Sequence, residues 1–276
     1  MIKSRIAPTP SGLLHRGNAL NFLLTSALVA EGRGELRLRI DDLDAPRVRT
    51  AYLDDIFETL RWLGIHWSQG PMDVADHVAN YRQELRLSLY ENLLDQLVTT
   101  GQVFACTCSR KALAAASQDG QYPGTCRFKN LPLNTPDASW RMITPENIFI
   151  HFQDAFLGKL SINLFDQARD FVIRRRDGLP AYHIASLADD VQYGINTIVR
   201  GEDLLLSTAV QLYLTQLLQL TDFETVKFYH HPLIKDDMGA KLSKSAGSTS
   251  MHHLRQSGLT GKNFRTEFEH WRSLIK

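Results

Sequence analysis

Hydrophobic residues recur with two different periods over the first hundred positions. The run Glu35–Ile40 alternates between polar and apolar side chains, which predicts a strand, and residues 3–7 form a shorter strand-like run. Between them, the apolar stretch Gly17–Ala30, followed by Gly32 and Gly34, predicts a helix and its end. Two more helices are predicted from apolar residues at helical spacing: Leu53, Ile56, Phe57, Leu60 and Leu63, and then Tyr81, Leu85, Leu89, Leu93 and Leu97. Strands that alternate with helices are typical of a parallel sheet.

The pattern changes near Gly101, where cysteines, prolines and short strand-like runs replace the long helices as far as Asp170. This change predicts a small α+β module over residues 101–169, inserted between two halves of the first domain. The predicted strands of the module are Trp140–Ile143, Ile148–Asp154 and Lys159–Leu164.

The alternation of strands and helices resumes after the module. Phe171–Ile173 and Thr197–Arg200 are strand-like, whereas Ala181–Tyr193 and Leu204–Leu218 are helical. We therefore predict an α/β domain in two halves, residues 1–100 and 170–247. A short amphipathic helical tail over 248–276 is predicted to follow.

Composition narrows the class of protein. The chain has 276 residues and is 43% hydrophobic, enough to bury one substantial core and a smaller module. No apolar run approaches the roughly 18 residues of a membrane span and no secretory signal is evident, so we expect a cytoplasmic protein without membrane contact. The formal net charge of +1 argues against a generally basic RNA-binding surface. RNA contact is therefore expected only at local patches such as Arg174–Arg176.

Two segments that lie far apart in the chain carry the strongest chemical signal. The first, Arg5–Asn18, ends with Pro-Ser-Gly, His15 and Gly17 at the start of a predicted helix. A glycine-bounded turn that opens a helix can bind phosphate through its backbone N–H groups. The second segment, Lys241-Leu242-Ser243-Lys244-Ser245, places two lysines where they can wrap a triphosphate. Each segment alone is a weak signal, but together and in this order they indicate ATP chemistry.

The three cysteines of the chain, Cys106, Cys108 and Cys126, all lie within the predicted module. In a cytoplasmic protein such clustering favours a metal over a disulfide, because thiolates bind Zn²⁺ tightly. A tetrahedral site needs a fourth ligand, for which Tyr122 is the nearest oxygen donor and His151 is a rival. Three reduced thiols without a metal are the alternative interpretation.

The two nucleotide segments and four other runs resemble the catalytic half of the glutamyl-tRNA synthetases, which are class I aminoacyl-tRNA synthetases. The four runs are Arg39–Asp42, Ala181–His183, Ile198–Asp203 and Tyr229–Leu233. The resemblance spans roughly residues 3–247 and implies a Rossmann-like catalytic domain. Full-length members continue into an anticodon-binding domain, which we expect to be absent here. Together with the Cys-x-Cys, Tyr, Cys arrangement, this makes the chain similar to the truncated branch of the family, which attaches glutamate to queuosine, the modified wobble base of tRNA(Asp).

The resemblance implies a reaction in two steps. A glutamate carboxylate attacks the α-phosphorus of ATP to give glutamyl-adenylate and pyrophosphate, and a hydroxyl of queuosine then takes the acyl group. Neither step needs a protein nucleophile, so positioned positive charge should supply most of the catalysis. By resemblance, His15 and Lys244, with Lys241 behind it, are the catalytic groups, and Mg²⁺ neutralises the remaining charge. The other ATP-binding positions are Pro8, Gly12, Gly17 and Asn18.

The family pattern also implies a glutamate site. It assigns Arg5 to the α-carboxylate, Thr9 and Asp41 to the ammonium group, and Tyr182 with Arg200 to the side-chain end. Ala7 completes the set.

Three residues depart from the family pattern, and two of them, Asp41 and Arg16, matter most. Asp41 stands where glutamyl enzymes usually carry Glu, and the glutaminyl branch of the family does use Asp there. Arg200 nevertheless favours glutamate, because a buried guanidinium facing a neutral amide would be an unpaired charge. Arg16 occupies a usually aliphatic position, and its side chain could point at solvent or crowd the nucleotide. Asn18 in place of a second histidine keeps a hydrogen-bond donor.

Three other functions remain open from the sequence. The chain could activate glutamate or glutamine for a different acceptor, it could be a non-catalytic binding protein, or it could charge tRNA 3′ ends. The intact Lys-Leu-Ser-Lys-Ser segment argues against the second, and the expected lack of an anticodon-binding domain argues against the third. We expect a monomer that acts on the anticodon stem-loop of tRNA(Asp).

Overall fold

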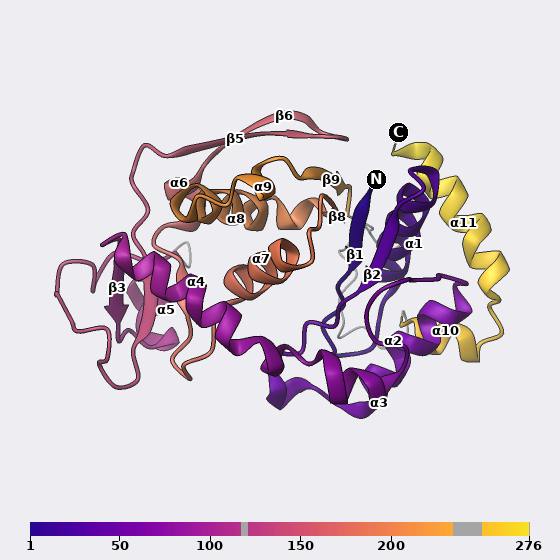
Figure 1. Ribbon diagram of the computed structural model, residues 1–276, viewed down its shortest axis with the longest axis horizontal. Helices are drawn as coiled ribbons and strands as arrows, with labels where there is room; N and C mark the ends of the chain where they lie inside the picture. Colours follow the sequence, from indigo (N-terminus) through magenta and orange to yellow (C-terminus); the bar gives the residue numbers. More distant parts are fainter. Residues whose placement is uncertain (117–120, 234–249, 276) are drawn as a thin grey trace.

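The structure is a computed structural model that describes residues 1–116, 121–233 and 250–275 (Figure 1). Two pairs of parallel strands form its centre. One pair is β1 (Lys3–Ile6) with β2 (Glu35–Leu38), and the other is β8 (Thr197–Gly201) with β9 (Lys227–His231). The pairs lie side by side, because the Asn196 N–H donates to the Lys3 carbonyl oxygen at 3.0 Å. The predicted parallel pairing is confirmed.

Helices cover the faces of these strands, because the apolar face of each helix has to be buried against another element. α1 (Arg16–Glu31) packs on β1 and β8, and α2 (Thr50–Trp62) joins the same hydrophobic core. A second core forms around α4 (Leu87–Thr99), α7 (Tyr182–Gln192) and α8 (Leu205–Leu218), with the short α9 (Thr221–Glu224) beside α8. The predicted helices are thus present.

α1 ends where the sequence predicts, but for a different reason than a left-handed glycine cap. Gly32 has φ −82°, and the left-handed residue is Arg33. A Cβ on Gly34 would lie 2.2 Å from the Ile2 carbonyl oxygen. Glycine is therefore needed here because the chain passes directly against the start of β1.

The helix predicted from Tyr81 begins only at Leu87. Before it lie α3 (Val74–Asp76), a π-helical turn over His77–Tyr81 and a 3₁₀ turn over Gln83–Arg86. Asp42 explains the interruption, because its carboxylate accepts the Gln83 backbone N–H at 2.8 Å and lies 3.0 Å from His77 Nε2. Tertiary hydrogen bonds therefore override the local helical spacing, and Leu85 is left 58% exposed.

The cysteine module is built on a second, antiparallel sheet. Its strands are β3 (Val103–Cys106), β4 (Ser139–Met142) and β7 (Val172–Arg174), and α5 (Arg110–Ala116) follows β3. The hairpin of β5 (Phe149–Asp154) and β6 (Gly158–Asn163), followed by α6 (Leu164–Ala168), instead joins β9.

The sheets consequently do not follow the predicted module boundaries at 101 and 169. Phe171–Ile173, predicted to resume the α/β domain, contributes β7 to the module, while the hairpin inside the predicted module extends the catalytic sheet. Strand pairing over such sequence distances leaves no local signature, because the strand-like runs look alike whichever sheet they enter.

The predicted tail contains two helices, α10 (Met251–Gln256) and α11 (Gly261–Leu274). α11 lies along α1, at the opposite end of the molecule from β3 and α5 (Figure 1). Phe264 and Phe268 are buried in the core of the first strand pair.

Two short 3₁₀ turns, Ala45–Arg47 and Glu202–Leu204, complete the described elements. Within the described residues, no helix has both the length and the apolar content needed to cross a membrane.

Candidate active site

A cavity opens at the carboxyl ends of β1 and β8, between the amino termini of α1 and α7. Open parallel α/β sheets bind ligands at this edge. Nine predicted site residues line it: Arg5, Ala7, Pro8, Thr9, His15, Gly17, Asn18, Tyr182 and Arg200. Asp41 and Gly12 do not line it, and Lys241 and Lys244 lie outside the described residues. The predicted residues from both halves of the domain therefore share one cavity.

His15 caps the amino terminus of α1 at the cavity. Its Nδ1 accepts the Asn18 backbone N–H at 3.3 Å, and the Asn18 side-chain oxygen accepts the His15 N–H at 3.1 Å. Because Nδ1 is an acceptor, the neutral ring carries its proton on Nε2. The positive end of the α1 dipole faces the cavity, as an anionic phosphate requires. Asn18 thus serves as a reciprocal cap.

Arg16 points away from the cavity. Its guanidinium forms a two-pronged ion pair with Glu267 on α11, with Nε 3.0 Å from Oε1. The preceding residue, Leu14, donates its N–H to Asp55 Oδ2 on α2 at 3.0 Å. Of the two orientations that the sequence left open for Arg16, neither is correct, because the side chain neither crowds the nucleotide turn nor extends freely into solvent.

Arg200 presents an unpaired positive charge to the cavity. It is 3% exposed, and its Nη1 donates to Thr208 Oγ1 at 3.2 Å and to Gln211 Oε1 at 3.0 Å. Nε and Nη2 have no hydrogen-bond partner among the described residues. Burial lowers the pKa of Arg200 to about 10, which still leaves it charged at neutral pH. A buried cation with free donors is a binding site for an anionic group.

The neighbouring His183 adds no second charge. Burial and the Arg200 charge lower the pKa of His183 to about 4, so the imidazole is neutral near pH 7. Its Nε2 lies 3.2 Å from Ser207 Oγ. The cavity therefore concentrates its positive charge on arginines.

A buried ion-pair network supports Arg5 and contains Asp41. Asp190 Oδ1 accepts from Arg5 Nε at 2.9 Å and from Arg39 Nη1 at 2.7 Å. Arg39 also binds both Asp41 oxygens, at 2.6 and 3.1 Å. Burial raises the pKa of Asp41 even though Arg39 opposes this shift. The Asp41 carboxylate is thus paired with Arg39 behind the cavity, which explains why Asp41 does not line the wall.

Several cavity residues were not predicted individually, although some fall in the motifs that carry the resemblance. His231 and Gly201 are examples, and Asn21 lies outside those motifs. His231 Nδ1 donates to the Pro232 carbonyl oxygen at 2.9 Å, so Nε2 accepts from Asn21 Nδ2 at 3.0 Å. Burial lowers the pKa of His231. A Cβ on Gly201 would lie 2.6 Å from Asp203 Oδ1, so a larger residue here would displace the Asp203 side chain.

Both flanks of the lysine segment lie at the cavity. Leu233, the last described residue before the segment, lines the wall, and Ser250, the first one after it, pairs with His15 in a β-bridge. The Met251 N–H also donates to the Leu14 carbonyl oxygen at 2.7 Å. The nucleotide turn and the flanks of the lysine segment therefore share one location.

Comparison with known proteins identifies the family. The family described as tRNA synthetases class I (E and Q), catalytic domain, matches residues 1–265. This chain belongs to that family. It is 36% identical to the glutamyl-Q tRNA(Asp) synthetase of Nitratidesulfovibrio vulgaris, over 95% of this chain and 84% of the relative. It is 39% identical to the glutamyl-Q tRNA(Asp) synthetase of a Synechococcus species, over 92% of this chain and 82% of the relative.

Solved structures agree with the family assignment. A crystal structure of a glutamate tRNA ligase from Elizabethkingia meningosepticum, in complex with its amino acid, has a TM-score of 0.75 and 26% identity. The alignment covers 94% of this chain and 53% of that ligase. This class I synthetase chain therefore spans about half the length of the solved relative, and it has the catalytic domain of an aminoacyl-tRNA synthetase-type ligase.

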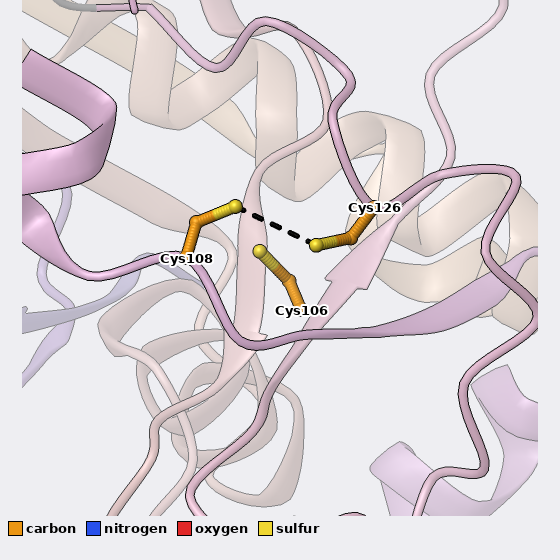
Figure 2. Close-up of side chains that lie close together, drawn as sticks. All are labelled: Cys106, Cys108 and Cys126. Carbon is orange, nitrogen blue, oxygen red and sulfur yellow. Dashed lines mark hydrogen bonds between the residues drawn. The ribbon is translucent and has the colours of Figure 1, made fainter. Parts of the chain in front are cut away.

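The three cysteines of the synthetase lie together, as the sequence predicts. Their sulfurs point toward one another and lie within 4.8 Å, with Cys108 and Cys126 Sγ atoms 3.5 Å apart (Figure 2). Tetrahedral zinc with Zn–S bonds of about 2.3 Å would hold sulfurs about 3.8 Å apart. Burial raises the pKa of Cys108 to about 11. Burial also opposes ionisation of Cys126, but hydrogen bonds from Thr107 and the other thiols lower its pKa to about 7. The donor set fits a thiolate-binding metal.

Tyr122 is the better fourth ligand of the two that the sequence suggests. Its hydroxyl lies in the cysteine cluster, where it accepts the Cys126 backbone N–H at 2.8 Å. His151 stacks on Phe149 in β5 and does not belong to the group of nearby ligand atoms found among the described residues. The rival ligand is therefore wrong, because β5 belongs to the catalytic sheet.

The predicted basic patch links the cysteine cluster to the catalytic domain. Arg176 donates to the carbonyl oxygen of Thr107, the residue between two of the cysteines, at 2.5 Å. Arg174 lies 4.7 Å from the centre of the Trp140 ring, and Arg175 pairs with Asp44 and Asp177. Only part of the patch is thus available to a partner, and Arg176 is its most exposed member.

Proposed function

We propose that this synthetase activates glutamate with ATP and transfers it to queuosine at the wobble position of tRNA(Asp). The observation that carries the proposal is the buried, unpaired guanidinium of Arg200 in the same cavity as the His15-capped terminus of α1. The guanidinium is suited to an acidic amino acid, and the helix terminus is suited to a phosphate. The names of the relatives support the choice of acceptor.

The buried charges of the site favour glutamate over glutamine. Arg5, Arg39 and the partly buried Arg86 pair with Asp41, Asp189 and Asp190, whereas Arg200 forms no ion pair among the described residues. The excess of one cation is located at Arg200. A side-chain carboxylate neutralises it, whereas a carboxamide leaves it unpaired at a cost on the order of several kcal/mol.

We assign the rest of the amino acid to the other lining groups. Arg5 takes the α-carboxylate, Thr9 faces the ammonium group, and Tyr182 with Arg200 holds the side-chain end, with Ala7 in the wall. Asp41 contributes through Arg39 and Asp190, which fix Arg5, rather than by touching the ammonium group.

ATP is assigned to the α1 side of the cavity, at Pro8, His15, Gly17 and Asn18, with Gly12 in the turn behind the wall and with Lys241 and Lys244 from the segment whose flanks lie there. In the first step a glutamate oxygen bonds to the α-phosphorus as the bond to pyrophosphate breaks. In the second, the acceptor hydroxyl bonds to the acyl carbon, its proton is lost and AMP leaves. The chain supplies positioned charge for both steps, and Mg²⁺ neutralises phosphate charge when bound.

Zinc is proposed as a structural ion of the module, held by Cys106, Cys108 and Cys126 with Tyr122 as the fourth ligand. Because Thr107 connects two ligands and also receives Arg176, an ordered cysteine cluster fixes the basic patch. We expect Cys106→Ser to lower bound zinc from about one to near zero per chain. Elemental analysis of the purified protein measures this, and unchanged zinc content would count against the site.

Labelled-glutamate transfer tests the acceptor. We expect tRNA(Asp) that carries queuosine to be labelled and tRNA(Asp) with guanosine at the same position to remain unlabelled. Equal labelling of both would remove the queuosine proposal. Glutamate-dependent exchange of pyrophosphate into ATP, run with and without tRNA, tests activation separately. Exchange without any tRNA labelling would indicate a different acceptor, and no exchange under either condition would favour a binding protein.

A further inference from the structure

The charge of Arg200 is connected through buried side chains to a hairpin that takes no part in the cavity. Thr208 Oγ1 on α8 receives Arg200 Nη1 at 3.2 Å and lies 2.9 Å from His230 Nε2 on β9. His230 Nδ1 lies 2.6 Å from Asp154 Oδ2 at the end of β5. Asp154, Thr208 and His230 are completely buried. Four side chains from four elements thus form one continuous hydrogen-bonded chain, here called the Arg200 relay.

The direction of each hydrogen bond follows from the ends of the relay. The Asp154 carboxylate only accepts, so His230 Nδ1 is a donor and, in the neutral ring, Nε2 is an acceptor. The Thr208 hydroxyl has one proton and two acceptors within reach, His230 Nε2 at 2.9 Å and the Leu204 carbonyl oxygen at 3.2 Å, and the shorter contact, to His230, completes the relay. Its oxygen lone pairs are left for the Arg200 guanidinium, which only donates. Every member therefore has the donor or acceptor role that its neighbour requires.

Both ends of the relay are fixed. Asp154 Oδ1 accepts the N–H groups of Phe156 and Leu157 at 2.9 and 3.0 Å, and Oδ2 accepts the His230 N–H at 3.1 Å. Burial disfavours the charged form of Asp154, but the hydrogen bonds from His230 and the two backbone groups lower its pKa. The His230 ring also stacks on Phe228, with 6.1 Å between centroids. The imidazole consequently has one available position.

We propose that Asp154, His230 and Thr208 are positioning residues that aim the free Nε and Nη2 of Arg200 at the side-chain carboxylate of the amino acid. Arg200 has two anchors, Thr208 and Gln211, and both bind the same nitrogen, Nη1. Two acceptors on one nitrogen fix the rotation of the guanidinium plane, and with it the position of Nε and Nη2, which are buried and have no partner among the described residues. Loss of the Thr208 anchor leaves the plane free to turn.

This inference rests on the proposed function and deepens it, because it explains how a cation that forms no ion pair in the described part of the chain is kept in a binding geometry. The relay contains no residue of the nucleotide turn and ends on the amino-acid side. The expected signature is therefore a defect in glutamate binding that spares ATP binding.

Steady-state exchange of pyrophosphate into ATP tests the relay. Thr208→Val replaces the hydroxyl with a methyl group of similar size, and His230→Asn keeps a donor toward Asp154 but loses the contact with Thr208. We expect each change to raise the glutamate KM about 10-fold, since it weakens the hydrogen bonding that orients a charged group. The KM for ATP should change less than about 2-fold, because the nucleotide turn is untouched.

Three controls separate positioning from general damage. Thr208→Ser keeps the hydroxyl and should restore the wild-type KM for glutamate. Thr215→Val makes the same substitution in the same buried helix, at a hydroxyl that bonds only the Gln211 carbonyl oxygen, and should leave both KM values unchanged. In an Arg200→Lys background, adding Thr208→Val should cause no further loss, since residues acting through one group are not additive.

The outcomes are distinct. Absence of glutamate-dependent exchange in the wild-type protein would overturn the proposed function and this inference with it. Normal wild-type exchange with a glutamate KM in Thr208→Val and His230→Asn within 2-fold of wild type would overturn the relay alone. Equal increases in both KM values, matched by Thr215→Val, would show that these residues only support packing, and would also overturn it.

Discussion

At the amino-acid end of the cavity the charged groups are buried and bonded to one another, whereas at the nucleotide end the ion pair of Arg16 with Glu267 is more than a third exposed. The first arrangement requires desolvation of buried charges, and its carboxylates orient the guanidinium groups from the side away from the cavity. The second holds the turn that opens α1, whose helix terminus lies at the cavity. Under the proposed function, selection of the amino acid depends on individual charges, while the phosphates are bound mainly by the main chain at the start of α1.

The sharpest way to test this contrast is to remove the unpaired cation. We expect Arg200→Met to lower glutamate-dependent exchange at least ~100-fold, because truncating one partner of a buried charge pair costs about 2–5 kcal/mol. The melting temperature should not fall, since Arg200 forms no ion pair within residues 1–116, 121–233 and 250–275 and its charge disfavours burial. A retained exchange rate, or a large loss of stability, would contradict this account of the site.

Removing a paired charge at the same end should instead lower the stability of the fold. Asp190→Asn leaves Arg5 and Arg39 without their shared carboxylate, and we expect it to reduce the free energy of unfolding by about 3–5 kcal/mol. Urea denaturation measures the change, with the exposed Asp95→Asn as a matched control that should lie near wild type. Equal stabilities of the two variants would show that the network contributes little.

The amino-acid end should also make the stability of the fold depend on pH. Unfolded His183 binds a proton near pH 6.5, whereas in the fold its pKa is about 4. Between these values the unfolded chain takes up more protons, so stability falls as the pH is lowered, by up to roughly 3 kcal/mol. Unfolding at pH 6.5 and 4.5 should differ more in the wild type than in His183→Gln. The exposed His270→Gln should retain the wild-type difference.

The smallest effect is expected at the nucleotide end. Glu267→Gln removes the partner of Arg16, and a partly exposed pair contributes about 0–1 kcal/mol. The KM for ATP should therefore rise less than about 3-fold, and the KM for glutamate should not change. A rise above 10-fold in the KM for ATP would mean that α11 shapes the phosphate site more strongly than the contrast between the two ends implies.

Sequence reasoning located the cavity well because its residues fall in short motifs. Positions 5–18 belong to one strand, one turn and one helix start, and nine predicted residues do share a cavity. What joins them could not be predicted in this way. Arg39 meets Asp190, and Asp154 meets His230, across large separations in the chain, and no local period encodes such pairs.

The same limit explains the other differences. The direction of Arg16 depends on Glu267 in the tail, and the late start of α4 depends on Asp42. The hairpin of β5 and β6 could be assigned to its sheet only once Asp154 was seen beside β9. Residue type indicated that charge would be buried here, but the identity of each partner depended on the folded topology.

The contacts between α11 and α1 affect the order in which this part of the enzyme folds. Phe264 and Phe268 complete the core that contains Ile6 and Leu14, and Arg272 pairs with Glu31, so the turn before α1 and α1 itself pack against residues that are synthesised much later. Contacts so distant in sequence form late, because closing a long loop costs entropy before any contact offsets it. During translation, this turn is therefore expected to reach its final packing only after α11 has been made.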